Sequence, residues 1–298
     1  IQSDRPKSER KIICLVSSQM EWNEYKMVNK KKTDSKKIKI NKYLIAGLII
    51  TGIVIIIGII SAFATPYSTT EMSAAEKFAA PSLRHIMGTD NFGRDIFSRV
   101  MKGIGTTVLI STLVILFSGT AGIIIGAFTG YFGGIIDEIV MRITDALNSF
   151  PSILLALVII SLLGSGKQNV ILSLGIVFIP SFVRIVRGEF IRLRDSEYVK
   201  NARLMGVGTL RIMFVHILPN IMPTFIVSVI VGINNTILAE SGMSYLGIGV
   251  QPPDASLGKM LSDAQGYLFN APWYALAPGI TIVIIVLGVS LIGEGVRK

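Results

Sequence analysis

Residues 195–220 read DSEYVKNARLMGVGTLRIMFVHILPN and separate two long apolar segments of the chain. The stretch is too polar to cross a bilayer, but its pattern is typical of ordered structure. Ser196 is suited to cap a short helix, because serine is a preferred residue at helix N-termini. Tyr198, Ala202 and Met205 then recur at helical spacing, so we expect a short helix here.

Two glycines end this predicted helix. Gly206 and Gly208 tolerate the left-handed backbone that closes many helices. Thr209 can cap a second helix, which we expect over residues 210–218, with Pro219 closing the motif. The pattern predicts a rigid helix–elbow–helix unit at a membrane face, which suits docking to another protein. An ordinary amphipathic loop fits the same spacing equally well.

The composition indicates a membrane protein. Of 298 residues, 51% are hydrophobic, and the mean hydropathy is +0.62. Several segments exceed the roughly 18 uncharged residues that suggest a membrane helix. The single cysteine, Cys14, excludes an internal disulfide, and only two histidines are present. The sequence contains no GxxxxGK[ST] phosphate loop and no nucleophile motif, so we expect no catalytic, cofactor or metal site.

Six apolar segments predict an all-α fold with six membrane helices. They cover residues 43–64, 106–128, 135–164, 168–186, 220–239 and 275–292. In the second segment Gly122 and Gly126 have the spacing that lets helix backbones approach closely. In the third, Glu138 and Arg142 have the favourable orientation for an ion pair, and Pro151 is expected to kink the helix.

The distribution of basic residues predicts the orientation. With the N-terminus inside, the inner segments hold 22 Lys and Arg residues and the outer segments hold 7, which places both termini and residues 195–220 in the cytosol. We therefore expect a basic cytosolic tail (1–42), a first membrane helix (43–64), an extracytoplasmic loop (65–104) and a five-helix domain (105–293). The tail is suited to contact anionic lipid. Nucleic acid binding is disfavoured, because aromatic residues do not interleave its lysine run.

The longest outer segments are patterned as well. Residues 85–100, HIMGTDNFGRDIFSRV, place Asp90, Arg94 and Asp95 where they can pair locally. A catalytic carboxylate pair is the alternative, but we favour a structured loop that leads into the second span, since no nucleophile accompanies the acids. Residues 241–273 are rich in glycine, proline and aromatic residues, which predicts a compact, irregular segment.

Residues 195–220 resemble the "EAA" signature of the permease subunits of binding-protein-dependent ABC importers. Gly206 takes the glycine position of that signature, and Leu218 and Pro219 take its closing pair. Of the EAA letters only Ala202 matches, since Lys200 and Asn201 replace the first two. His216 stands where the signature has isoleucine.

Three further stretches are similar to the "C" type permeases for dipeptides, oligopeptides and nickel. Residues 88–95 match GTD-x-x-GRD, residues 244–261 match SFLGLGVQPP-x-x-S-x-G-x-ML, and residues 271–273 match APW. Leu257 stands where a tryptophan is common. The resemblance runs from about residue 85 to the end of the chain.

The resemblance implies the transmembrane domain of a type I ABC importer in a bacterial or archaeal plasma membrane. Such a subunit pairs with a second permease, two cytosolic ATPases hydrolyse ATP, and an extracytoplasmic binding protein delivers the substrate. The residues expected to couple to the ATPases are Asn201, Ala202, Arg203, Gly206, Val207, Gly208, Leu218 and Pro219. Asn234, Asn235 and Glu240 are candidates to line the pathway or its gate, with helix–helix hydrogen bonding as the alternative.

Peptide is the substrate class that the resemblance favours, and nickel or a metal chelate is the alternative. Two other classes of protein compete with the importer. An ion-coupled secondary transporter would carry buried acidic residues at mid-membrane, and the spans are nearly free of them. A membrane scaffold would not require the ordered glycine elbow.

Overall fold

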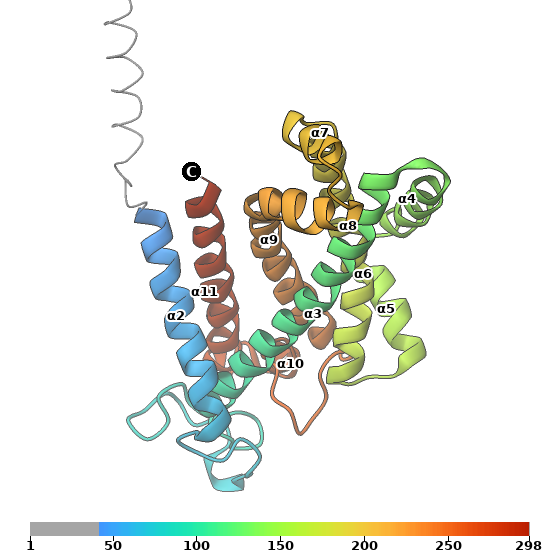
Figure 1. Ribbon diagram of the computed structural model, residues 1–298. Coiled ribbons are helices and arrows are strands. Elements are labelled where there is room, and N and C mark those ends of the chain that lie inside the picture. The colour runs from blue at the N-terminus through green and yellow to red at the C-terminus, as the bar shows by residue number, and fades with distance from the viewer. Residues whose placement is uncertain (1–41, 298) are drawn as a thin grey trace, which may run out of the picture. The chain divides into compact units, whose positions relative to one another are not determined.

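The computed structural model describes residues 42–297, and long helices dominate them (Figure 1). Five helices are long and apolar enough to cross a membrane, and a bent pair makes up to six. The five are α2 (Lys42–Phe63), α3 (Ile96–Phe132), α6 (Lys167–Arg194), the continuous helix Thr209–Tyr245 that contains α9 (Leu218–Tyr245), and α11 (Pro272–Arg297). The all-α membrane fold is therefore as expected. The tail predicted for residues 1–42 lies outside the described residues except for Lys42.

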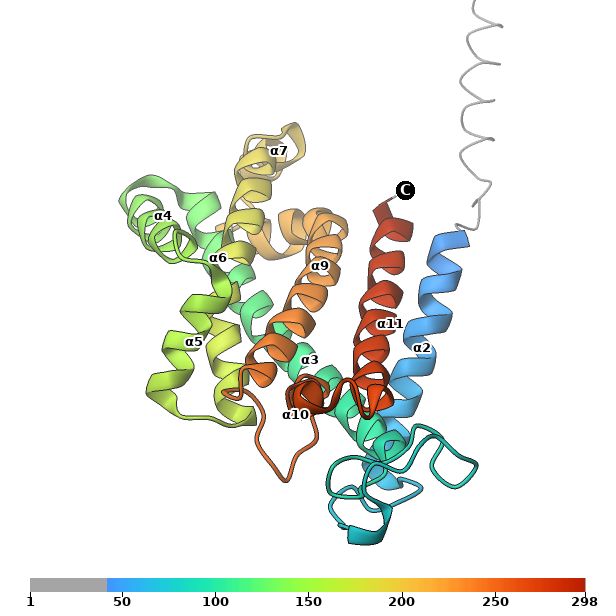
Figure 2. The ribbon, with the colours of Figure 1, turned by 180° about the vertical axis from the view of Figure 1, so that it is seen from behind.

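The shorter elements connect these helices. They are η1 (Ala74–Glu76), α4 (Gly134–Asn148), α5 (Ser152–Leu163), α7 (Glu197–Leu204), α8 (Thr209–Arg211), η2 (Ile212–Ile217), α10 (Leu257–Ala264) and η3 (Gln265–Tyr267). In both ribbon views α7, the start of α2 and the last turn of α11 lie at one end, and residues 64–95 and α10 lie at the other (Figures 1 and 2). The segment expected to be irregular over residues 241–273 thus contains a regular helix, α10.

The third span differs from its prediction. Residues 135–164 were expected to form one kinked helix, but α4 and α5 meet at an angle of 93°. The break falls at Pro151, which disfavours helical backbone in the residue before it. Ion pairs then hold α4 against α6: Arg187 makes two hydrogen bonds to Asp137, and Arg184 lies 2.6 Å from Asp145. The expected Glu138–Arg142 pair forms on the exposed face of α4, at 2.9 Å.

The second span is longer than its apolar core predicts. Helix α3 begins at Ile96, ten residues before the expected start, because the Asp95 carboxylate accepts a hydrogen bond from the backbone N–H of Ser98. It continues to Phe132, where Gly133 adopts a positive φ of 66°. The apolar window found by hydropathy therefore marks only the middle of this helix.

The glycines of α3 bring it close to α6, as their spacing predicts. A Cβ atom at position 126 would lie 2.8 Å from the carbonyl oxygen of Val183 and 2.8 Å from Cβ of Val186. Gly122 faces Phe182 in the same way, and Gly130 faces Phe190. The interior of the described residues forms two apolar clusters, one centred on α3, α6 and α9 and one on α2, α3, α10 and α11.

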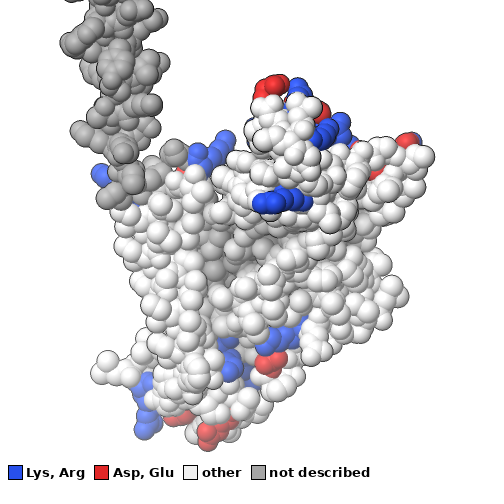
Figure 3. All heavy atoms as spheres, in the orientation of Figure 1, with Lys and Arg blue, Asp and Glu red and all other residues white. Residues whose placement is uncertain are grey.

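The charges on the face shown in Figure 3 lie in two bands. Basic and acidic side chains gather at the α7 end and at the opposite end, with an uncharged zone between them (Figure 3). An uncharged zone of this kind is what the hydrocarbon core of a bilayer requires, because an unpaired charge there is costly. The bilayer therefore crosses the molecule between α7 and α10.

The packing of α3 on α6 predicts the effect of a single substitution. Gly126→Val would place a side chain against backbone and side-chain atoms of α6, and overpacking of this kind costs about 1–3 kcal/mol. We expect a lower melting temperature of the detergent-solubilised protein. Gly52→Val is the matched control, because no heavy atom lies within 4 Å of a Cβ built at Gly52 of α2. Equal melting temperatures for the two variants would contradict the packing argument.

Candidate functional site

A short helix and a glycine elbow form the end of the molecule that carries residues 195–220. Helix α7 starts after Ser196, whose hydroxyl donates to the carbonyl oxygen of Leu193 and makes no capping bond. At its other end Gly206 has a φ of 76° and donates to the carbonyl of Arg203, while Val207 donates to that of Ala202. These two bonds form a Schellman motif, which satisfies carbonyls at a helix end and needs a glycine at its left-handed position.

We use the name elbow for residues 199–210. Its first part, the root, is buried, and its turn, the tip, exposes apolar side chains. Val199 and Ala202 are buried in the α3–α6–α9 cluster. Leu204 and Met205, at the turn itself, are 86% and 78% exposed, and Leu210 just beyond is 61% exposed. The turn lies at the α7 end of the molecule (Figure 1). Exposed apolar side chains gathered at a rigid turn are typical of a protein docking site.

Contacts to the end of α3 hold this elbow in place. The guanidinium group of Arg203 donates to the hydroxyl of Tyr131 at 3.2 Å and lies 5.7 Å from the centre of the tyrosine ring. Arg194, at the end of α6, donates to the carbonyl oxygen of Gly130 at 3.3 Å. Arg203 therefore has a partner within this chain, whereas Asn201 has an exposed side chain.

The second half of the motif runs into the membrane helix without a break, which corrects the expected helix end at Pro219. The N-cap position of α8 is Gly208, and its φ of −62° is not left-handed. A π-helical turn, η2, follows and continues into α9, where Pro219 lies in the first turn. A wider turn suits this place, because Pro219 has no N–H to donate to the preceding turn.

The three candidate pathway residues lie on α9, in different surroundings. The amide nitrogen of Asn234 donates to Ser290 of α11 at 2.9 Å, which is the helix–helix hydrogen bond considered as the alternative. Asn235 is exposed. Glu240 is only 1% exposed and is enclosed by protein.

Hydroxyl groups from three parts of the chain surround Glu240. One carboxylate oxygen accepts from Ser244 at 2.8 Å and from Ser256 at 2.9 Å, and the other accepts from Thr107 at 3.2 Å. Ser244 in turn accepts from the backbone N–H of Val250. Glu240 therefore ties residues 244–256 to α3 and α9, a role that its position near the end of an apolar segment did not reveal.

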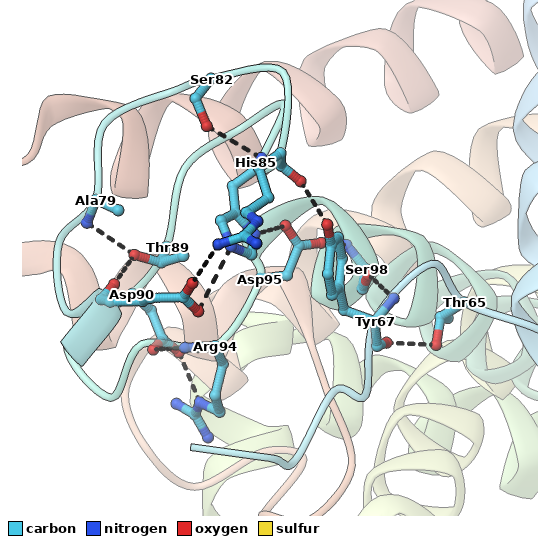
Figure 4. A network of polar contacts seen from close by, with 12 residues as sticks. Thr65, Tyr67, Ala79, Ser82, His85, Thr89, Asp90, Arg94, Asp95 and Ser98 are labelled. Carbon is cyan, nitrogen blue, oxygen red and sulfur yellow. Dashed lines mark hydrogen bonds and ion pairs between the residues drawn. The ribbon is translucent and has the colours of Figure 1, made fainter. Parts of the chain in front are cut away.

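The residues of the 85–100 motif form a polar clamp (Figure 4). Asp90 is fully buried and accepts from Arg94 Nε at 2.7 Å and from the backbone N–H groups of Phe92 and Arg94. Asp95 caps α3 and lies 2.9 Å from Nδ1 of His85. The expected local pairing of Asp90 with Arg94 is thus confirmed. Since the hydrogen bonds of both carboxylates hold the loop, this arrangement is structural.

Sequence reasoning missed several partners of these residues. Tyr131 as the partner of Arg203, Asp137 as the partner of Arg187, and the three hydroxyl groups around Glu240 carry no local signal of their own. Ser244 and Ser256 both lie within the stretch 244–261 that carried the resemblance, which was the one available indication.

Comparison with known proteins agrees with this geometry. Residues 122–298 match the family described as "binding-protein-dependent transport system inner membrane component". The dipeptide transport system permease protein DppC of Alkalihalophilus pseudofirmus is 38% identical over 92% of this chain and 90% of its own length. The glutathione transport system permease protein GsiD of Pectobacterium atrosepticum is 38% identical over 73% of this chain and 72% of its own.

A solved structure shares the fold. A chain of the MetNI methionine ABC transporter in an inward-facing conformation superposes with a TM-score of 0.57 at 18% identity, over 67% of this chain and 95% of that one. The chain belongs to the family of inner membrane components of binding-protein-dependent transport systems. It is a multi-pass, non-catalytic permease subunit, as the resemblance implied.

The Glu240 cluster predicts how residues 244–256 respond to mutation. Glu240→Ala leaves the hydroxyls of Thr107, Ser244 and Ser256 without their acceptor, and an unsatisfied buried group costs about 1–3 kcal/mol. We expect amide hydrogen exchange over residues 244–256 to rise about tenfold or more. Glu240→Gln keeps a carbonyl acceptor and should show a smaller rise. Unchanged exchange in Glu240→Ala would show that the cluster does not hold the segment.

Proposed function

We propose that this chain forms one half of the translocation pathway of an ABC importer for di- and oligopeptides. The observation that carries the proposal is the exposed apolar elbow at the end of α7, in a chain that is 38% identical to a dipeptide permease over nearly its whole length. A permease hydrolyses no ATP itself, so it needs a rigid surface on which the force of partner ATPases acts.

The elbow suits this coupling role because it is connected to three membrane helices. It joins α6 to α9 directly, and Arg203 and Arg194 fasten it to the end of α3. A displacement of the tip is therefore passed to three membrane helices at once, as in other rigid-body switches. The residues that we assign to the coupling surface and its support are Asn201, Ala202, Arg203, Gly206, Val207, Gly208, Leu218 and Pro219.

The assembly and its orientation follow from this assignment. The end that carries α7 faces the cytosol, and so do both termini, in keeping with the excess of Lys and Arg residues on the inner segments. A second, similar permease completes the pathway, two ATPases dock beneath the elbows, and a binding protein approaches residues 65–95 and α10 from outside. Asn235, exposed on α9, is our candidate for the pathway surface, with Asn234 and Glu240 supporting that helix.

The coupling role predicts a loss of transport without a loss of the protein. Gly206→Asp places a side chain in left-handed backbone, which glycine adopts more readily than any other residue, and adds a charge beside the apolar tip. In cells whose only copy of this permease is the variant, we expect uptake of a labelled dipeptide to fall about tenfold or more. The amount of the chain in the membrane should remain normal.

Gly188→Ala, inside α6, is the matched control, because Gly188 lies outside the residues assigned to coupling, its backbone is not left-handed and no atom lies within 4 Å of the added Cβ. It should transport normally. Normal uptake by Gly206→Asp would sink the coupling role. If the unaltered permease supported uptake of nickel and not of dipeptides, the peptide assignment would fail while the coupling role stood.

A further inference from the structure

A groove between α2 and α3 has cationic groups at one end and apolar walls along its length. Its volume is about 470 Å³, and it lies outside both the elbow and the Glu240 cluster. The residues of its lining that matter most here are Ile59, Ser61, Lys102, Leu109, Lys167 and Asp254. We propose that this groove binds an anionic phospholipid, with the phosphate at Lys102 and Lys167 and an acyl chain along α2 and α3.

The two lysines at the mouth of the groove form no ion pair in the described residues, unlike four other basic residues on the same side of the chain. Among the described outer basic residues, four form ion pairs with carboxylates: Arg84, Arg94, Arg99 and Lys259. Lys102 and Lys167 line the groove and form no ion pair in the part of the chain that the structure describes. The ammonium group of Lys102 donates only to the carbonyl oxygen of Ser61, at 3.4 Å. Two such lysines beside a single carboxylate, Asp254, favour an anion.

The groove walls are apolar even at their serine and threonine residues, because the hydroxyl groups of these residues donate to backbone carbonyls of their own helix. The hydroxyl of Thr106 donates to the carbonyl oxygen of Lys102, and that of Thr112 donates to that of Val108. Ser61 likewise donates to Gly58. The ten residue steps from Lys102 to Thr112 span about 15 Å of helix. The groove therefore offers a polar head site and a long hydrocarbon site, and not a row of polar groups suited to a peptide backbone.

The position of the groove fits the same ligand. Lys102 contacts the last turn of α2, which ends at Phe63. Lys102 thus lies beside the outer end of α2, close to the depth at which phospholipid phosphates lie. The apolar wall residues Ile59 and Leu109 are 57% and 45% exposed, so an acyl chain can enter from the bilayer. Basic pockets between membrane helices are a known type of site for anionic lipid head groups.

The test measures lipid binding to the full chain, purified with whatever subunits accompany it and placed in phosphatidylcholine nanodiscs. Phosphatidylglycerol with the same acyl chains is titrated in, and bound lipid is counted by native mass spectrometry. We expect saturable binding of phosphatidylglycerol and none of inorganic phosphate. Lys102→Gln and Lys167→Gln should each weaken it about fivefold. Leu109→Trp should abolish it by filling the groove while both charges remain.

Lys77→Gln is the matched control, since Lys77 is exposed on the same side of the chain and does not line the groove. It should bind phosphatidylglycerol as the unaltered chain does. Equal binding by all three groove variants would overturn the proposal. The proposal would also be overturned if a dipeptide bound in a manner that depends on Lys102 and displaced phosphatidylglycerol, because the groove would then belong to the solute pathway. Neither outcome bears on the coupling role of the elbow, which is read out by transport.

Discussion

The close packing of α3 on α6 is the constraint on which the rest of the structure depends. Because Gly122, Gly126 and Gly130 carry no side chains, α6 lies directly on α3 along their shared length. The ends of the two helices therefore meet, and α7 emerges beside Tyr131. This packing fixes the root of the elbow while its apolar tip stays exposed, as the proposed coupling role requires.

The opposite end of the molecule is held by different chemistry. Besides the packing of α10 on its neighbouring helices, buried carboxylates hold the irregular segments there: Asp90 and Asp95 fasten residues 65–95, and Glu240 fastens residues 244–256. Each acid is surrounded by several donors, so each segment has one defined arrangement. This difference between the two ends is consistent with the proposed coupling surface at the α7 end.

The sequence predicted what depends on neighbours along the chain and missed what depends on distant ones. The helix–elbow unit with Gly206 at its turn and the glycine face of α3 were read correctly, because each is a local pattern. The sharp bend at Pro151 was underestimated, since ion pairs between α4 and α6 help to set it. The hydroxyls around Glu240 come from positions 107, 244 and 256, which no spacing rule connects. Lys102 and Lys167 likewise converge only in the folded chain.

Cross-linking from the tip of the elbow tests the central claim most directly. Met205→Cys, made together with Cys14→Ser, would carry a photoreactive group in the complex purified from its host, and Phe269→Cys would serve as the control because it is fully exposed in the opposite segment. We predict that position 205 labels an ATP-binding subunit, that added ATP changes the yield, and that position 269 labels none. Absence of an ATP-binding subunit from the products at position 205, or equal labelling from both positions, would contradict the account.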